Sequence, residues 1–443
     1  MAAQIIFLII LIVASVVAYK RFVVVKRNIF LGRKLEVKGE TSQRWKTMFL
    51  IALGQGKMFA RPLAAVMHLF IYVGFVIINI EVVEILIDGL FGTHRVLSFL
   101  GGFYNFLIAS FEWLAALVLL ACVVFLARRN FAKIPRFFAK EMTTWPKTDA
   151  NLILIIEILL MTAFLVMNAT DFLLQERGAE HYELSGSFPV SSHIAVLFQT
   201  FSDNSLVMIE RGCWWFHIIG ILGFIVYLTY SKHLHIILAF PNTYYSKLEP
   251  AGEFSNLESV TNEVRLMIDP SASVSQSDGP PQKFGAKDVF DLSWVNLMNA
   301  YSCTECGRCT SECPANQTGK LLSPRKIMMD TRDRMEEIGK KLDRDNSFFK
   351  TACAPSEVYN DGKSLLRDYI SEEEIWACTS CNACTEACPI NIDPLEIIID
   401  LRRFLIMEES KSPESITVMF NNIENNGAPW AMSSLDRANW TDD

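Results

Sequence analysis

The sequence predicts an all-α protein in two parts, a bundle of five membrane-spanning helices followed by a mostly α-helical soluble domain. The chain has 443 residues, of which 51% are hydrophobic and 31 are phenylalanine. This apolar excess is concentrated in the first 240 residues, whereas the rest of the chain is polar and holds eight cysteines in two tight groups. The net charge of −7 argues against nucleic acid as the main partner.

Five apolar segments are long enough to cross a bilayer, which takes about 20 residues. They cover residues 5–25, 62–86, 103–126, 152–174 and 207–240. The first could be a signal peptide. It has no basic segment before it and no small-residue cleavage site after it, so we expect a retained helix.

The basic residues predict how these helices are oriented. Residues 20–61 contain eleven Lys and Arg and residues 128–147 contain six, whereas the loops near 89–102 and 175–205 contain one each. The positive-inside rule then places the N-terminus outside and the cysteine-rich half in the cytoplasm, with the helices in the inner membrane.

Histidines inside the apolar segments are candidate haem ligands. His217 and His235 are eighteen residues apart, so a continuous helix would carry them on one face, about 27 Å apart. His68 lies about two turns into the second helix, at the depth of His235. Since axial histidines from facing helices can hold haem b, we predict that His68, His217 and His235 bind one or two haems. The alternative is that they form hydrogen bonds or reach the interface, and His233 fits that alternative best.

The partner of His217 is not evident from the sequence, although His193 in "PVSSHIAVLFQTF" could fold back toward it. Four acidic residues also lie within the spans: Glu81, Glu84, Glu112 and Glu157. Intramembrane acids often mark proton or quinone sites. We take Glu112 and Glu157 as candidates for quinone protonation, since the first two could lie at the outer interface.

The two cysteine groups read "CTECGRCTSECPA" and "CTSCNACTEACPI", and both follow the ferredoxin spacing C-x2-C-x2-C-x3-C-P. In this pattern three cysteines wrap one cubane, and the fourth starts a helix and reaches the other cubane. Proline suits the first turn of that helix. One [4Fe–4S] cluster is predicted to bind Cys303, Cys306, Cys309 and Cys388. The other is predicted to bind Cys378, Cys381, Cys384 and Cys313.

This pattern predicts a bacterial-type 2[4Fe–4S] ferredoxin core. A zinc site is the alternative, but zinc usually binds two cysteine pairs separated by a longer loop. Cys122, Cys213 and Cys353 are interpreted as ordinary thiols, and Cys353 as a ligand only if a neighbouring chain completes the site. Residues 270–282 are typical of a linker, and no nucleotide-binding or hydrolytic motif is present.

Three stretches carry a resemblance: "HLFIYVGF", "WWFHIIGILGFIVYLTYSKHLHIILAFPN" and "FGAKDVFDLSW…CTECGRCTSECPANQTGKLLSPRKI". The chain resembles the membrane-bound heterodisulfide-reductase-related iron–sulfur oxidoreductases. Their membrane part is similar to the cytochrome b (gamma) subunit of nitrate reductase, and electron-transfer-flavoprotein:menaquinone oxidoreductases belong to the same group. The resemblance implies haem b, a nearby quinone site and cytoplasmic electron transfer through two cubanes.

Two departures from that family matter. The gamma-subunit pattern has two histidines on an early helix, and here only His68 is present. Fused members of the family continue into cysteine-rich CCG domains after a junction similar to "ENNGAPWAMSSLDRANWTDD". We therefore expect a separate CCG polypeptide that docks near the tail. Trp430 and Trp440 fit such a docking segment, or they pack back on the ferredoxin domain.

Together these features predict a cytochrome b domain (1–245), a linker (246–283), a dicluster domain (284–412) and a tail (413–443). We expect it to pass electrons between a cytoplasmic partner and the quinone pool, most simply as a subunit that reduces menaquinone. The partner would be the CCG subunit, an electron-transfer flavoprotein or another dehydrogenase. The alternatives are a non-catalytic membrane anchor and electron wire, and an ion-translocating or redox-sensing protein.

Overall fold

The computed structural model describes residues 1–250, 252–269, 271, 283–344 and 359–442, which form helices, turns and loops without a β-strand. They divide into two compact units. Unit 1 consists of Met1–Arg27, Thr47–Phe240 and Thr304–Cys306; unit 2 consists of Asn28–Lys46, Pro241–Cys303 and Gly307–Asp443.

The predicted helical fold class is confirmed, while the ferredoxin core and the domain boundaries stay predictions. Most of the predicted linker, and Cys353, lie outside the described residues.

Unit 1 contains the five helices that are long and apolar enough to cross a membrane. They are α1 (Ala2–Ile29), α3 (Pro62–Phe91), α4 (Gly102–Asn130), α5 (Trp145–Glu176) and α7 (Asp203–Leu228). The prediction of five spans is confirmed, and the chain is a multi-pass membrane protein. The connecting segments form short helices: η1 (Phe49–Leu53), η2 (Met58–Ala60), η3 (Val96–Leu100), η4 (Pro135–Phe137), η5 (Lys140–Met142), α6 (Ser191–Ala195), η6 (Val196–Phe198) and η7 (Lys232–Leu234).

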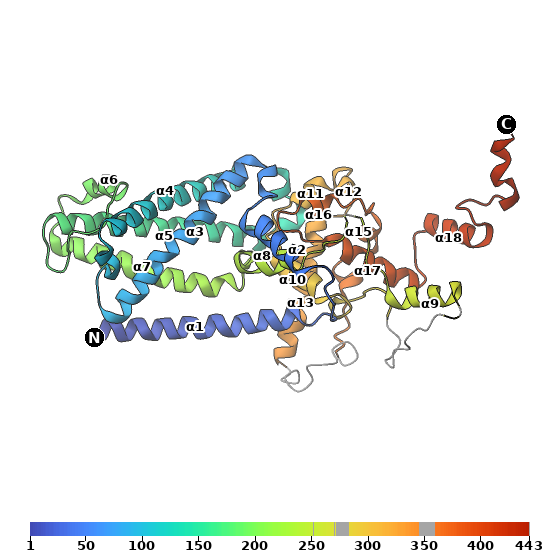
Figure 1. Cartoon of the computed structure of the whole chain (residues 1–443), viewed down its shortest axis with the longest axis horizontal. Helices are drawn as coiled ribbons and strands as arrows, with labels where there is room; N and C mark the ends of the chain where they lie inside the picture. Colours follow the sequence, from blue (N-terminus) through green and yellow to red (C-terminus); the bar gives the residue numbers. More distant parts are fainter. Residues whose placement is uncertain (251, 270, 272–282, 345–358, 443) are drawn as a thin grey trace. The chain divides into compact units, whose positions relative to one another are not determined.

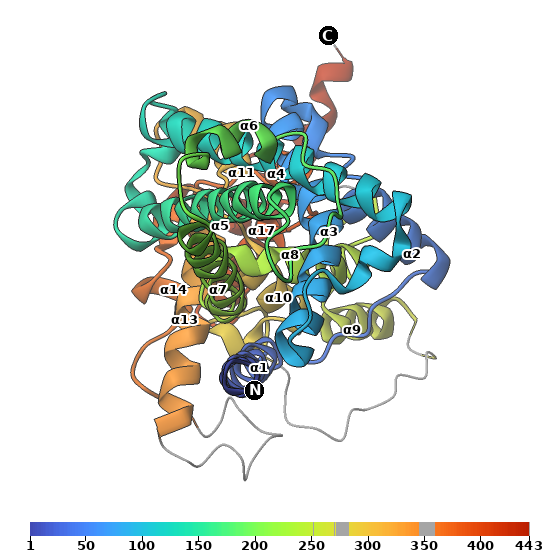
Figure 2. The same cartoon turned by 90° about the vertical axis from the view of Figure 1, so that its left-hand side faces the viewer.

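Helix α5 is central to the bundle of unit 1. It packs between α4 and α7, and α3 packs on the other flank of α4 (Figure 1; Figure 2). The core between these helices is apolar and includes Ile108, Phe164 and Ile218, none of which is exposed. Gly74 lets α3 approach α4 closely, because a Cβ at this position would lie only 2.5 Å from the Val118 side chain.

Helix α1 lies at the edge of this bundle. Its residues Ile5, Ile9 and Val13 are more than half exposed, as expected for a helix that faces lipid. Phe7 is the exception. It is buried against Trp214 of α7, with the ring centroids 5.6 Å apart, so one aromatic side chain holds the start of α1 against the bundle.

The fifth span differs from the prediction. The sequence predicts a continuous helix over 207–240, but α7 ends at Leu228 and the chain turns before η7 and α8 (His235–Tyr244). The cause is Asp149, a buried carboxylate on α5. It accepts hydrogen bonds from the Tyr227 hydroxyl, from Ser231 Oγ (2.6 Å) and from the Lys232 backbone N–H (3.2 Å). A carboxylate that gathers these donors stabilises a turn, so the eighteen-residue phase between His217 and His235 does not hold.

Unit 2 is built from shorter helices around the two cysteine runs. Its longest buried helices, α13 (Pro324–Arg344) and α17 (Pro394–Met407), pack on each other and on α10 (Trp294–Ser302). Helices α11 (Arg308–Glu312) and α16 (Ala383–Ala387), one from each run, also pack together. The remaining helices are α2 (Thr41–Met48), α9 (Glu258–Ile268), η8 (Val289–Asp291), α12 (Pro314–Gln317), α14 (Leu365–Asp368), α15 (Glu372–Trp376), α18 (Glu414–Asn426) and η10 (Ser434–Thr441).

The loop that follows α1 is part of unit 2, although the sequence predicts that it belongs to the membrane domain. The Asn28 side chain donates to the Tyr301 hydroxyl at 2.9 Å, and the Arg33 backbone N–H donates to the Leu292 carbonyl at 2.8 Å. Gly339 permits the first contact, because a Cβ there would lie 2.4 Å from the Asn28 side chain.

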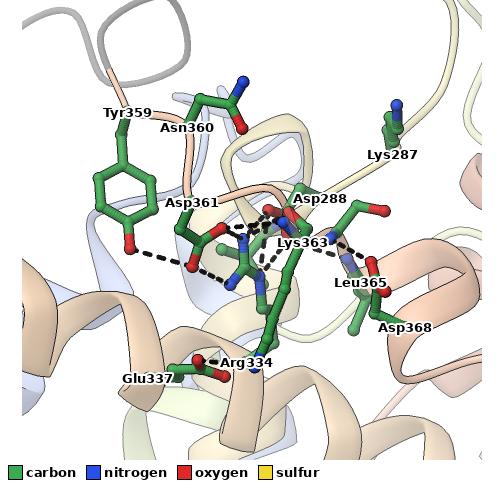
Figure 3. Close-up of polar contacts among 12 residues, drawn as sticks. Lys287, Asp288, Arg334, Glu337, Tyr359, Asn360, Asp361, Lys363, Leu365 and Asp368 are labelled. Atoms are coloured by element: carbon green, nitrogen blue, oxygen red, sulfur yellow. Dashed lines mark hydrogen bonds and ion pairs between the residues drawn. The ribbon is translucent and has the colours of Figure 1, made fainter.

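Arg334 of α13 links the segments that precede the two cysteine runs (Figure 3). Its guanidinium is 1% exposed and pairs with Asp288 at 2.6 Å and with Asp361 at 2.8 Å. Asp288 also accepts the backbone N–H of Leu365 at 3.1 Å. The arginine side chain holds the pKa of Asp361 well below its usual range, helped by Lys341. Since both acids bind one buried cation, the two segments are fixed to one helix.

Candidate functional site

The two cysteine runs have the same backbone conformation. Glu305 and Ser380, at the same position of each run, have φ of 56° and 57°. Two residues later Gly307 and Asn382 are also left-handed and start α11 and α16. Turns that alternate right- and left-handed residues direct their N–H groups into an anion-binding concavity, a geometry that suits iron–sulfur sites. The repeat in sequence is therefore a repeat in structure.

One pocket of unit 2 gathers four of the predicted ligands. Cys313 of the first run lines it together with Cys378, Cys381 and Cys384 of the second run. Leu322, Pro324, Leu395 and Ile398 supply apolar walls. In the described part of the chain no three Cys, His, Asp or Glu side chains stand close enough to bind one metal ion, and these four sulfurs surround a space instead. Four thiols in an apolar pocket suit a [4Fe–4S] cluster.

Polar contacts around this pocket act on its sulfurs. The Ser380 N–H donates to Cys378 Sγ at 3.4 Å, and Arg402 of α17 donates to the Cys378 carbonyl. Burial raises the pKa of the Cys378 thiol, while these two groups act in the opposite direction. Burial also raises the pKa of Cys384, to about 12, and Asp393 adds to it. These thiols stay protonated at neutral pH until iron displaces their protons.

The other predicted set comprises Cys303, Cys306, Cys309 and Cys388. Cys306 belongs to unit 1 and the other three belong to unit 2, so each is described within its own unit. Cys303 is 8% exposed at the C-cap of α10. Cys388 accepts the Ile392 N–H at 3.3 Å through its sulfur, the kind of contact that tunes cluster potentials.

Sequence reasoning missed an ion pair in unit 1. Glu305, inside the first cysteine run, is 3% exposed and pairs with Lys232 of η7. The ammonium also donates to the Pro146 carbonyl at 2.6 Å and lies 3.9 Å from Asp149. Burial lowers the pKa of Lys232, and Glu305 opposes that shift. The only sequence signals for this pair are an acid inside a cysteine loop and a lysine beside His233.

The structure brings three of the candidate histidines together in unit 1. The rings of His233 and His235 are 5.3 Å apart, and His68 lies within electrostatic range of His233. His235 Nδ1 is 3.2 Å from the Lys232 carbonyl, which leaves Nε2 for another partner. Burial lowers the pKa of His233 to about 3, aided by the other two histidines, and lowers that of His235 to about 4. Both imidazoles are therefore neutral at pH 7, the form that binds iron.

His217 is separate from this group. It is 1% exposed on α7, its Nδ1 is 3.0 Å from the Leu160 carbonyl, and its ring contacts Phe164. This hydrogen bond orients the ring and leaves Nε2 available, as in many metal-binding histidines. His193, its suggested partner, is exposed on α6.

The two candidate acids have different surroundings. Glu112 of α4 is fully buried, and both of its oxygens are occupied by the Asn168 amide (3.2 Å) and by the N–H groups of Val190 (2.9 Å) and Ser191 (3.0 Å). It fixes the segment before α6 in place. Glu157 is half-buried on α5. A role for either acid in quinone protonation stays a prediction.

Comparison with known proteins supports the resemblance inferred from the sequence. A family described as a 4Fe-4S dicluster domain matches residues 302–392. The chain is 29% identical to a probable iron-sulfur-binding oxidoreductase, FadF, of Bacillus subtilis over 98% of its own length, and 28% identical to an EtfAB:quinone oxidoreductase of Syntrophomonas wolfei over 93%. It is also 29% identical to a probable membrane-anchored ferredoxin of Chromohalobacter salexigens, over 38% of this chain and 25% of the relative.

Shorter matches extend to several components of archaeal heterodisulfide reductases. One of them, from a ferredoxin- and F420H2-dependent CoB-CoM heterodisulfide reductase of Methanosarcina acetivorans, is 29% identical over 29% of this chain and 60% of the relative.

These relatives confirm the suspected class, that of membrane-linked iron–sulfur electron-transfer oxidoreductases. The chain spans 61% of the Bacillus relative and 57% of the Syntrophomonas relative. No solved structure gives a significant match.

Proposed function

We propose that this chain passes single electrons between a cytoplasmic partner and the membrane quinone pool, as a quinone reductase subunit. The observation that carries the proposal is the pocket of unit 2, where Cys313 joins Cys378, Cys381 and Cys384. An exchange of the fourth cysteine between two runs is the arrangement of a two-cluster ferredoxin. Such a protein accepts and delivers one electron at a time, which suits transfer between a soluble carrier and a quinone.

The four sulfurs of this pocket would hold one [4Fe–4S] cluster, and Cys303, Cys306, Cys309 and Cys388 would hold the other. Each bound cluster supplies reversible one-electron chemistry. The protein contributes the soft thiolate ligands, the apolar walls that keep water out, and the N–H groups that stabilise charge on sulfur.

Haem b would be held by the histidine group of unit 1. His68 comes from α3, whereas His233 and His235 come from the turn after α7, so imidazoles from two sides could bind one iron. Bound haem supplies a one-electron carrier within the membrane. His235 is favoured over His233 because the Lys232 carbonyl fixes its ring. His217 stays a candidate ligand for a second haem.

The basic loops support an inner-membrane orientation in which the N-terminus is outside and the cysteine runs are in the cytoplasm. The partner there would be an electron-transfer flavoprotein or other dehydrogenase, or a separate iron–sulfur subunit, because a curated relative is named an EtfAB:quinone oxidoreductase. The quinone would be menaquinone.

A second candidate function is a non-catalytic anchor and electron wire within a larger complex. It is favoured by the coverage of the relatives, since about four-tenths of each lies outside the match. Quinone-reductase activity of the isolated chain would argue against it, and activity that appears only with a partner would support it.

The first test is a pyridine haemochrome assay with iron and sulfide analysis on the detergent-purified protein. We expect about eight iron atoms and at least one haem b per chain. His68→Ala and His235→Ala should both abolish the same haem, and His193→Ala, an exposed histidine, should leave it in place. Loss of a further haem in His217→Ala would establish two haems. Absence of haem from the native protein would overturn the cytochrome assignment and leave a membrane-tethered ferredoxin.

A further inference from the structure

A buried polar network surrounds Arg95 in unit 1. Arg95 lies in the loop between α3 and α4, has φ of 51°, and is 7% exposed. Its guanidinium donates to Asp171 Oδ2 at 2.6 Å, to the Asn168 side-chain oxygen at 3.0 Å, and contacts the Tyr104 hydroxyl at 3.1 Å. All its donor groups point into the bundle, so this arginine is the cation of the network.

The network contains more acid than this one cation can balance. Four buried carboxyl groups lie within it, each at most 4% exposed: Glu81, Glu84, Glu112 and Asp171. Glu84 accepts the Leu97 N–H at 2.8 Å and the Tyr104 hydroxyl at 3.0 Å. Glu112 accepts three hydrogen bonds, as described above. Those two acids are therefore stabilised as carboxylates by neutral donors.

Glu81 differs from these acids. Its Oε2 is buried and has no hydrogen-bond partner in the described chain, although Glu81 lies within electrostatic range of Arg95, Glu84, Glu112 and Asp171. A buried carboxylate without donors is strongly unfavourable, and such a group takes up a proton instead. Because Arg95 is already engaged by Asp171, Glu81 is the group on which the excess charge is neutralised.

We propose that Glu81 is a proton-exchange site of the membrane unit, with Asp171 and His94 as its connection to the solution. Asp171 Oδ1 is the second buried oxygen in this network without a hydrogen bond. His94 Nε2 lies 3.6 Å from it, and the His94 side chain is 23% exposed. A proton taken up from the solution by His94 can therefore reach Asp171 Oδ1, across Arg95 from Glu81.

Other charged groups set the behaviour of His94. Burial lowers its pKa, Asp171 and Glu210 raise it, and Arg95 and Arg211 lower it. The Tyr182 ring packs edge-on against it, with centroids 4.9 Å apart. An imidazole held neutral by burial, beside an acid that favours its charged form, can accept and release a proton near neutral pH.

The role of the site follows from charge balance and rests on the proposed function. When one electron enters unit 1 from the iron–sulfur donor, the unit gains one negative charge in a medium of low dielectric. Uptake of one proton by the Glu81 carboxylate restores the net charge. Oxidation by quinone removes the electron, and the same proton returns to the solution through Asp171 and His94.

The test is infrared difference spectroscopy on the detergent-purified full chain, oxidised and then reduced with dithionite. A protonated carboxylic acid has a C=O stretch that is separate from the amide bands and shifts in D2O. We expect reduction to increase this band in the native protein and the change to be lost in Glu81→Gln. Glu112→Gln is the matched control, since that acid is fully hydrogen-bonded, and it should keep the change. His94→Ala should slow the D2O shift of the band.

Three outcomes would overturn the proposal: a band that is unchanged in Glu81→Gln, a band lost in Glu112→Gln, or no change on reduction of a protein whose haem is spectroscopically reduced. An unchanged exchange rate in His94→Ala would overturn the connection to the solution. Haem content is measured on the same samples, so failure of the cytochrome assignment is distinguishable from failure of the proton site.

Discussion

The two cysteine runs share spacing and backbone but have different surroundings. In the first run, the left-handed position is Glu305, which is buried in an ion pair with Lys232. In the second run the same position is Ser380, which donates only its N–H to the neighbouring sulfur. Cys303 of the first run is 8% exposed, whereas Cys381 of the second is exposed.

This difference shows that spacing determines the shape of a cluster loop, while the residues between the cysteines determine its neighbours. A buried acid of the first loop is held by a lysine, and an exposed cysteine leaves the second loop accessible. Within the proposed function, a soluble partner would reach the second run.

The largest expected effect tests whether the runs exchange their fourth cysteine. Cys313→Ser lies in the first run but lines the pocket of the second, so it should remove the second cluster. Iron should fall from about eight to about four atoms per chain, and the paramagnetic resonance spectrum should match that of Cys384→Ser. Cys122→Ser, in a membrane helix, is the control and should keep all the iron. A spectrum like that of Cys309→Ser would show that each run binds its own cluster.

The next effect concerns the two equivalent left-handed positions. Glu305→Gln leaves Lys232 buried beside a neutral amide, so the free energy of unfolding should fall by about 3 kcal/mol. Ser380→Ala keeps the backbone N–H and should change it by less than about 0.5 kcal/mol. Thermal unfolding in detergent measures both. Equal losses in the two variants would mean that the loops are held in the same way.

The acids that precede the runs give a comparison that depends on pH. The folded-state pKa of Asp361 lies below the ordinary value of 3.8, chiefly because of Arg334. Its contribution to stability is therefore complete above about pH 5 and is lost as the pH falls toward the folded-state value. Asp361→Asn should cost about 2 kcal/mol at pH 7 and progressively less below pH 4. Unfolding of both proteins from pH 7 to pH 3 checks this, and a pH-independent difference would contradict it.

The smallest effect concerns a charge beside the second run. Arg402 contacts the Cys378 carbonyl and stacks on Trp376, with its guanidinium 4.9 Å from the ring centre. Reduction adds negative charge, which this cation stabilises, so Arg402→Gln should lower the midpoint potential of one cluster by about 30–60 mV. Arg402→Lys should restore most of it. Arg403→Gln, next in sequence, pairs with Asp400 and should leave the potential unchanged.

Local pattern is sufficient to predict the five spans and the repeated cysteine loops, because hydropathy and fixed spacing belong to neighbouring residues. It fails where distant residues decide. The break after Leu228 is caused by Asp149 on another helix, so nothing within 207–240 reveals it. That break brings His233 beside His235, whereas a continuous helix would have separated their directions.

Contacts made only in three dimensions are also out of reach of the sequence. The ion pair of Glu305 joins a cysteine loop to η7, and no spacing rule connects them. The sequence suggests an interfacial position for Glu81, because it does not show whether a carboxyl oxygen has a donor. Glu112 stands out in the sequence by its depth alone, and its three hydrogen bonds appear only once the segment before α6 is in place.

The packing of α1 has a consequence for how its sequence can vary. Its middle, from Ile9 to Val16, faces lipid, and Ile9, Ile12 and Val13 are each more than half exposed. Protein neighbours select residues only where the helix is held, at Phe7 and again near Val25. Between these points only the thickness and greasiness of the bilayer act as selection. Isoleucine, valine, leucine and phenylalanine should therefore replace one another freely there over evolutionary time, while the two fixed ends change slowly.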